Sequence, residues 1–178
     1  MLRNNHGLTI TILVITVIIM LILAAVTMSI NINTNKGVEL KTLITNMEMI
    51  KTSAQGFSDR YKGIDDTKLP GTRETERGSI NSVIGLIIGY TQGEDENAVK
   101  ISPYWYLLDQ DALNAMNVDI QLEGDERYMV DYENMEVVYV KSLEVTDGIY
   151  PGVIRKSDKK VLYFYDQLKN VKIDDVEL

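Results

Sequence analysis

The sequence predicts an α+β fold in which a long N-terminal helix, first transmembrane and then amphipathic, precedes a small antiparallel β-sheet domain. The chain opens with an uncharged apolar run, Leu8–Ile30, and apolar residues recur at helical spacing in the segment that follows. Further along, short runs of β-branched and aromatic residues are separated by polar turns, as in antiparallel hairpins. We therefore divide the chain into a polar leader (1–7), an apolar helix (8–30), an amphipathic extension (31–61) and a globular domain (62–178).

Composition narrows the function classes. The chain has 178 residues and a net charge of −8, and Arg3 is the only charged residue among the first thirty, so the remainder is more acidic still. An acidic exterior repels phosphate, so we expect no nucleic acid partner. There is no cysteine, and His6 is the only histidine. Because thiolate and imidazole chemistry are missing from the globular part, we expect no enzyme activity and no cofactor. Nothing marks any pair among the 26 acidic residues as catalytic.

The run Leu8–Ile30 is predicted to cross a membrane. As a helix it is about 34 Å long at ~1.5 Å per residue, enough for a hydrocarbon core of about 30 Å. Its only polar groups are threonine and serine hydroxyls, which can bond back to carbonyls one turn earlier. Its β-branched residues favour strands in water, but a lone segment in lipid must satisfy its backbone internally, which favours helix.

Three interpretations of this run compete: a cleavable secretory signal, an uncleaved membrane anchor, and a processed assembly helix. A secretory signal normally has an apolar region of about 7–15 residues, shorter than this one. Flanking charge does not fix the orientation, because Arg3 precedes the run while Lys36 and Lys41 follow it. The bulk of the chain follows the run, which favours a C-terminal domain outside the membrane.

The leader favours the third interpretation. It ends in Asn4-Asn5-His6-Gly7, and the apolar run follows directly as Leu8-Thr9-Ile10 and continues through 13–19 and 21–27. This arrangement resembles the prepilin segment of type IV pilin-like proteins, including pseudopilins, of monoderm bacteria. The resemblance implies that a prepilin peptidase cleaves between Gly7 and Leu8 and methylates the new amino terminus on Leu8.

The resemblance also implies a function. The chain would be a major or minor structural subunit of a type IV pilus or of a type II secretion-like pseudopilus. Its partners would be the prepilin peptidase, other pilin-like subunits, an inner-membrane platform with its assembly ATPase, and membrane lipid. The protein would cross the cytoplasmic membrane once and reach the cell surface when assembled. The alternative is a stand-alone membrane-anchored adhesin or binding ectodomain.

One position departs from the family pattern. The family usually carries a glutamate at the fifth mature position, which pairs with the amino terminus of a neighbouring subunit, and here that position is Ile12. A carboxylate in hydrocarbon is useful only as the partner of a cation. Two alternatives follow: a minor or tip subunit, or a member of a subgroup that assembles by hydrophobic packing alone.

The amphipathic extension begins after a predicted break. Asn31–Gly37 is rich in turn formers and ends in glycine, which predicts that the first helix stops there. A second helix then follows, with one apolar stripe. The methionines Met47 and Met49 are both predicted to pack in the core. The stripe comprises Leu40, Leu43, Ile44, Met47, Ile50, Ala54, Phe57 and Tyr61.

The next segment is predicted to be a loop, Tyr61–Gly78, and a short helix that Ser79 caps and Gly89 ends. Its inward residues are Ile80, Val83, Ile84 and Ile87. Glu94, Asp95 and Glu96 follow in a polar stretch. Clustered acids can bind calcium, but the ligand spacing of a calcium loop is absent, so a solvated loop is the better interpretation and we expect no metal site.

A strand, a cap and a short helix come next. Tyr104–Leu108 is strand-like, Asp109 is a helix cap, and Gln110–Met116 is helical with Leu113 and Met116 toward the core. This succession also resembles the equivalent region of the monoderm pilin-like family.

Two hairpins complete the predicted sheet. Arg127–Tyr132 and Glu136–Lys141 are joined by a three-residue turn, in which Asn134 takes any left-handed position. Tyr128, Val130 and Tyr132 share one face, opposite Val138 and Val140. Tyr150–Lys156 and Val161–Tyr165 flank the turn Ser157-Asp158-Lys159, and the second of these strands is covered on both faces. The acidic tail 166–178 forms an edge or a loose terminus. The tyrosines could stack sugars or bases, but cross-strand packing with hydroxyls at the rim is the ordinary explanation.

Overall fold

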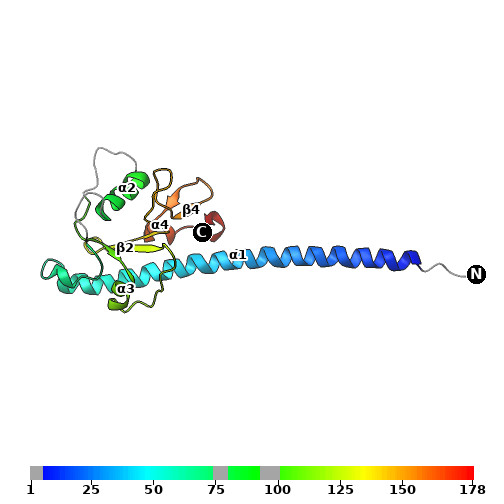
Figure 1. The fold of residues 1–178 in the computed structure, drawn as a ribbon, viewed down its shortest axis with the longest axis horizontal. Coiled ribbons are helices and arrows are strands. Elements are labelled where there is room, and N and C mark those ends of the chain that lie inside the picture. Colours follow the sequence, from blue (N-terminus) through cyan, green and yellow to red (C-terminus); the bar gives the residue numbers. More distant parts are fainter. Residues whose placement is uncertain (1–5, 74–79, 93–100) are drawn as a thin grey trace, which may run out of the picture. The chain divides into compact units, whose positions relative to one another are not determined.

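The computed structural model describes residues 6–73, 80–92 and 101–178 (Figure 1). Its elements are α-helices, short 3-10 helices and two antiparallel sheets, so the predicted α+β class is confirmed. The chain divides into two compact units, Met1–Glu39 and Leu40–Leu178.

The first unit consists of the N-terminal part of helix α1 (His6–Tyr61). Between residues 8 and 30 the backbone is helical, but side chains are described only at 16–20. The packing of the predicted apolar helix is therefore largely outside what the structure describes. Across the described residues, none of the helices combines the length and the apolar character that a membrane crossing requires. The predicted break at Asn31–Gly37 is wrong, because α1 continues through it. Asparagine, threonine and glycine each weaken a helix by at most about 1 kcal/mol, and no proline removes a backbone donor here.

The second unit is built around a three-stranded sheet in the order β1 (Trp105–Leu108), β2 (Arg127–Asp131) and β3 (Glu136–Val140). Figure 1 shows β2 between α1 and α2 (Ile80–Gln92), and the packing agrees. Tyr128 and Val130 pack in one cluster with the second half of α1. Met129 packs in a second cluster with α2, on the opposite face. The sheet is therefore covered on both faces.

The predicted stripe of α1 is largely confirmed. Met47 is buried, and the stripe residues Ile44, Phe57 and Tyr61 are partly buried against the same cluster. Met49 is 37% exposed, so its predicted core position is wrong. It lies two residues beyond Met47, which places it about 200° around the helix and away from the sheet. The other buried stripe residues are Leu40, Leu43, Ile50 and Ala54.

Helix α2 forms where the sequence predicts a helix, but it is longer. Val83, Ile84 and Ile87 are buried as predicted. The predicted stop at Gly89 is wrong, because the helix continues to Gln92. Glycine inside a helix costs about 1 kcal/mol, which does not by itself end the backbone hydrogen bonding. The predicted cap Ser79 and the side chain of Ile80 lie outside the described residues. In the predicted loop before it, η1 (Asp66–Lys68) forms a short 3-10 helix.

The strand, cap and helix after residue 100 are confirmed. β1 ends at Leu108, and the Asp109 side chain accepts a hydrogen bond of 2.8 Å from the backbone N–H of Ala112, at the start of α3 (Gln110–Ala115). Leu113 and Met116 are buried. Because the aspartate satisfies an N–H that has no partner inside the helix, this short helix has a defined start.

The first hairpin forms, but its predicted register is wrong by one residue. Tyr128 pairs with Tyr139, and Met129 pairs with Val138. The connecting loop has four residues, 132–135, rather than three. A shift of one residue exchanges the faces of a strand, so Val138 and Val140 lie on the α2 side with Met129. Tyr128, Val130 and Tyr132 share one face, as predicted.

The left-handed position of this loop is also not where it was predicted. Met135 has φ 55°, whereas Asn134 is not among the residues with positive φ. Asn134 instead donates a side-chain hydrogen bond of 2.7 Å to Asp131 Oδ2. In longer hairpin loops the left-handed residue stands directly before the returning strand, and here that residue is Met135.

The second hairpin is shorter than predicted and belongs to a second sheet, in the order β5 (Val161–Leu162), β4 (Val153–Arg155) and β6 (Val176–Glu177). Leu162 packs with the α1-side cluster and Tyr163 with the α2-side cluster, so the predicted burial of both faces is confirmed. The strand stops early because helix α4 (Tyr165–Leu168) begins there.

The acidic tail forms the edge of a sheet, which was one of its two predicted arrangements. After η2 (Ile173–Asp175), β6 pairs with β4 at the edge of the second sheet. The tail is not loose, because Leu168 and Val176 are fully buried. Charged residues at its solvent-facing positions conceal these two apolar anchors from a composition-based prediction.

Candidate functional surfaces

The structure does not describe the side chains predicted for processing, nor the three acidic residues that were considered, and not favoured, as calcium ligands. Gly7, Leu8 and Ile12 belong to α1, but their side chains lie outside those described. Glu94, Asp95 and Glu96 lie in the range 93–100, outside the described residues. Within the described part of the chain, no group of three or more acidic or histidine side chains could hold a metal ion.

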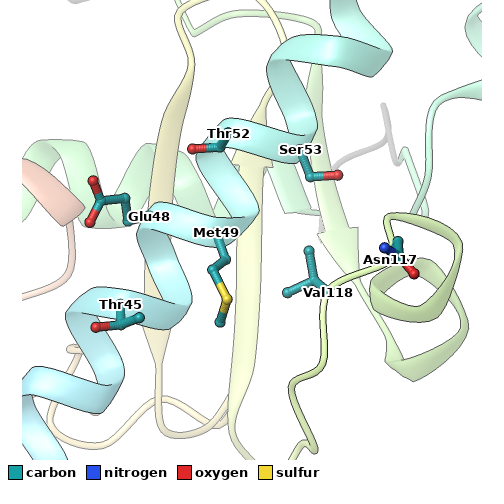
Figure 2. A pocket seen from close by; sticks show the side chains of 7 residues that line it. All are labelled: Thr45, Glu48, Met49, Thr52, Ser53, Asn117 and Val118. Atoms are coloured by element: carbon teal, nitrogen blue, oxygen red, sulfur yellow. The ribbon is translucent and has the colours of Figure 1, made fainter.

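A hollow of about 430 Å³ lies beside the second half of α1 (Figure 2). Met49 and Val118 lie on its two sides, one on α1 and the other on the segment after α3, and the Glu48 carboxylate points away from Val118. The Ser53 hydroxyl is already engaged, since it donates a hydrogen bond of 2.7 Å to the carbonyl of Met116. The complete lining is Thr45, Glu48, Met49, Thr52, Ser53, Asn117 and Val118.

The motif that ends α3 positions Asn117 and Val118, which line the side of the hollow opposite α1. Asn117 has φ 55° and donates its backbone N–H to the carbonyl of Asn114 at 3.0 Å, while Val118 donates to Leu113 at 3.0 Å. This pair of bonds is the Schellman arrangement that commonly ends helices, and asparagine is one of the few side chains that tolerate the left-handed position. The sequence signal was available: an asparagine stands directly after the predicted helix.

The hollow has the chemistry of a packing surface. Its lining offers a thioether, a valine, threonine methyl groups and one carboxylate that points away from Val118. A nucleophile paired with a general base is the minimum for covalent catalysis. Here the Ser53 hydroxyl is engaged with the Met116 carbonyl, and the Glu48 carboxylate points away from Val118, so the lining does not present such a pair. It is suited to receiving an apolar side chain.

The tyrosines form part of the core, as predicted. Tyr106 and Tyr132 meet edge to face at 5.1 Å between ring centroids. The Tyr132 hydroxyl donates a hydrogen bond of 2.9 Å to the Pro70 carbonyl, and that bond is buried, so the predicted rim position is wrong for this residue. Burial raises the pKa of Tyr132 and raises that of Tyr128 to about 12. Rings packed in this way cannot stack sugars or bases.

Asp131 is a fully buried carboxylate that sequence reasoning missed. It accepts hydrogen bonds from the Ser102 hydroxyl at 2.8 Å, the Glu133 backbone N–H at 2.9 Å and the Asn134 amide at 2.7 Å. Buried charges are tolerated where every oxygen has donors. Asp131 therefore fixes the start of the hairpin loop and the segment before β1, which is a structural role.

Comparisons with known proteins do not identify the chain: no family model, no curated protein and no solved structure matches it.

Proposed function

We propose that this chain is a structural subunit of a type IV pilin-like filament, made as a precursor and anchored by its apolar N-terminal helix. The observation that carries the proposal is in the sequence: a short polar leader ends in Gly7, and the uncharged run Leu8–Ile30 follows without a spacer. Such a run is long enough to cross a bilayer, and an ordinary anchor does not need a glycine at its start.

The architecture of the second unit supports the proposal. The half of α1 after Glu39 uses its apolar stripe to pack on the sheet, so that half is committed to the globular domain. Within the other half, the run Leu8–Ile30 has no charged residue with which to face water. In a filament this half would exchange lipid contacts for helix contacts of similar polarity, which needs close packing rather than a hydrophobic driving force.

Mass spectrometry of the mature chain tests the proposal. In cells with a working prepilin peptidase, we expect a chain that begins at Leu8 and carries one methyl group on its amino nitrogen. Gly7→Val should block cleavage, because the peptidase must accommodate the residue before the cut, and Asn4→Ala is the matched leader control that should still be processed. An intact Met1, or a terminus other than Leu8, would contradict the proposal.

Co-purification from crosslinked membranes separates the two candidate functions. A filament subunit is recovered with other pilin-like chains. A stand-alone adhesin or binding ectodomain, the alternative that Ile12 keeps open, is recovered without them. The abundance of the chain in the recovered fibres then distinguishes a major subunit from a minor or tip subunit.

A further inference from the structure

Two turns of the globular domain carry opposite charge. The turn between β4 and β5, residues 155–160, holds four of the chain's 18 basic residues and one acid; we call it the basic turn. The segment between α3 and β2, residues 119–126, holds four acids and no basic residue; we call it the acidic segment. The chain as a whole has a net charge of −8, so the basic turn stands out against an acidic surface.

The basic turn is held in a defined shape. Arg155 donates two hydrogen bonds to the Asp158 carboxylate, at 2.9 and 2.5 Å, and this pairing lowers the pKa of Asp158 to about 2. The Lys156 ammonium donates to the Asp174 carbonyl at 3.0 Å. Lys159 and Lys160 are exposed, and their ammonium groups form no ion pair with any residue that the structure describes. Two cations are therefore displayed on an ordered turn.

The acidic segment displays carboxylates in the same way. Asp119, Glu123 and Asp125 are exposed, and none of them forms an ion pair within the described ranges. The guanidinium of Arg127 donates instead to the backbone carbonyls of Gly124 and Glu126, at 3.1 and 2.6 Å. The backbone of the segment is thus fixed while three carboxylates stay available.

The two patches do not neutralise each other within one molecule. Among the described residues, no hydrogen bond or ion pair joins 155–160 to 119–126. The two patches belong to different connections of the fold, since the acidic segment joins α3 to β2 and the basic turn joins β4 to β5 (Figure 1). Complementary patches at different places on one chain give a heterologous contact, which continues from copy to copy instead of closing as a dimer.

We propose that the basic turn of one copy binds the acidic segment of a second copy. The inference rests on the proposed filament function and names the contact between its globular domains. Anionic lipid is the less suitable partner, because the net charge of the domain would oppose its approach to an anionic surface. Such a contact sets the register of association and acts over about 8 Å at physiological salt. Reversing the charges of one side replaces attraction with like-charge repulsion, which lowers the affinity as well as the rate of association.

Charge reversal on the full chain tests this contact. The processed chain is kept in a mild nonionic detergent, and its self-association is measured by sedimentation. We expect Lys159→Glu with Lys160→Glu to weaken association about tenfold, and Glu123→Lys with Asp125→Lys to do the same. Combining all four changes restores the attraction with its sign exchanged, so association should recover to within about threefold of the original. Lys41→Glu with Lys172→Glu changes the net charge equally and should have little effect.

Each other outcome counts against the contact. The proposal is wrong if either reversal leaves association unchanged, if the fourfold variant does not recover, or if the chain remains monomeric at all concentrations. It is also wrong if Lys159→Glu with Lys160→Glu abolishes binding to phosphatidylglycerol vesicles while self-association persists. Failure of the proposed filament function is detected by different observations: the mature chain keeps Met1, or it is never recovered in fibres.

Discussion

The turns of the two hairpins in the globular domain have a similar backbone conformation, but different side-chain interactions hold them in place. Each turn contains a non-glycine residue in the left-handed region, Met135 at φ 55° in the first and Lys159 at φ 59° in the second. The first turn is fixed by the buried carboxylate of Asp131, and the second by the exposed pair Arg155–Asp158. The first turn is therefore held by a buried group, whereas the second turn leaves the charges of Lys159 and Lys160 available for interaction.

Truncation of a buried side chain in the first hairpin should have the largest effect on stability. Met129 is fully buried between the sheet and α2, and we expect Met129→Ala to lower the free energy of unfolding by about 2–5 kcal/mol. Denaturant unfolding of the full chain in detergent measures this. Lys159→Ala, at an exposed position in the second turn, should alter stability by no more than about 0.5 kcal/mol. A similar cost for both would erase the distinction between the hairpins.

Removal of the buried carboxylate of Asp131 should have the second-largest effect on stability. Asp131→Ala leaves the donors of Ser102, Glu133 and Asn134 without their acceptor, which we expect to cost about 2–3 kcal/mol. The counterpart Asp158→Ala deletes a carboxylate that is exposed to solvent, and it should change the melting temperature little. The two melting curves, recorded at the same pH, give the comparison. A negligible change in Asp131→Ala would mean that the loop does not depend on this residue.

Local patterns predicted much of the globular domain. The stripe through Met47, the capped helix after Asp109 and the alternation at Tyr128 each depend on neighbours in the sequence, and each is found. The register of the first hairpin depends on whether Tyr132 belongs to the strand or the loop, which local pattern does not decide. Tyr132 ends in the loop while its ring stays in the core, and its hydroxyl bonds to Pro70, far away in sequence.

The candidate surfaces divide in the same way. Gly7 and Leu8 are proposed as the processing site from the sequence alone, because a short polar segment and the apolar run are contiguous. The hollow beside α1 is not, since Ser53 meets the carbonyl of Met116 across a separation of 63 residues. The opposed charges of the basic turn and the acidic segment are visible in the sequence, but only the structure shows which of those charges are already paired.

The left-handed residues allow a smaller test of the shared backbone. Glycine adopts φ near +55° without the penalty of a Cβ atom, so Lys159→Gly should stabilise the chain by about 0.5–1 kcal/mol. Met135→Gly relieves the same strain but loses the partial packing of Met135 against the core, so its gain should be smaller. Thermal unfolding of both variants measures the difference. If both variants lost stability, the left-handed geometry at these turns would be in doubt.

The smallest expected effect concerns the charge opposite Asp131 in the first hairpin. Glu136 is its cross-strand partner, and partial burial, then Asp131 and Asp166, raise the pKa of Glu136 above its ordinary 4.5, against the opposing effect of Lys51. A group whose pKa is raised on folding contributes stability at low pH, and that contribution is lost as the pH rises through the folded-state pKa.

Glu136→Gln should therefore match the original protein near pH 3 and exceed its stability near pH 7. Because Glu136 is only partly buried, solvent screens the repulsion and the gain should be only a few tenths of a kcal/mol. Glu133→Gln, on the same turn, controls for the loss of one negative charge. Unfolding measured across this pH range gives the answer, and a gain that is constant with pH would show that the carboxyl is not titrating against its neighbours. A gain that depends on pH, by contrast, would place the repulsion at Glu136, beside the buried Asp131, whereas the charges of Arg155 and Asp158 in the second turn are already paired.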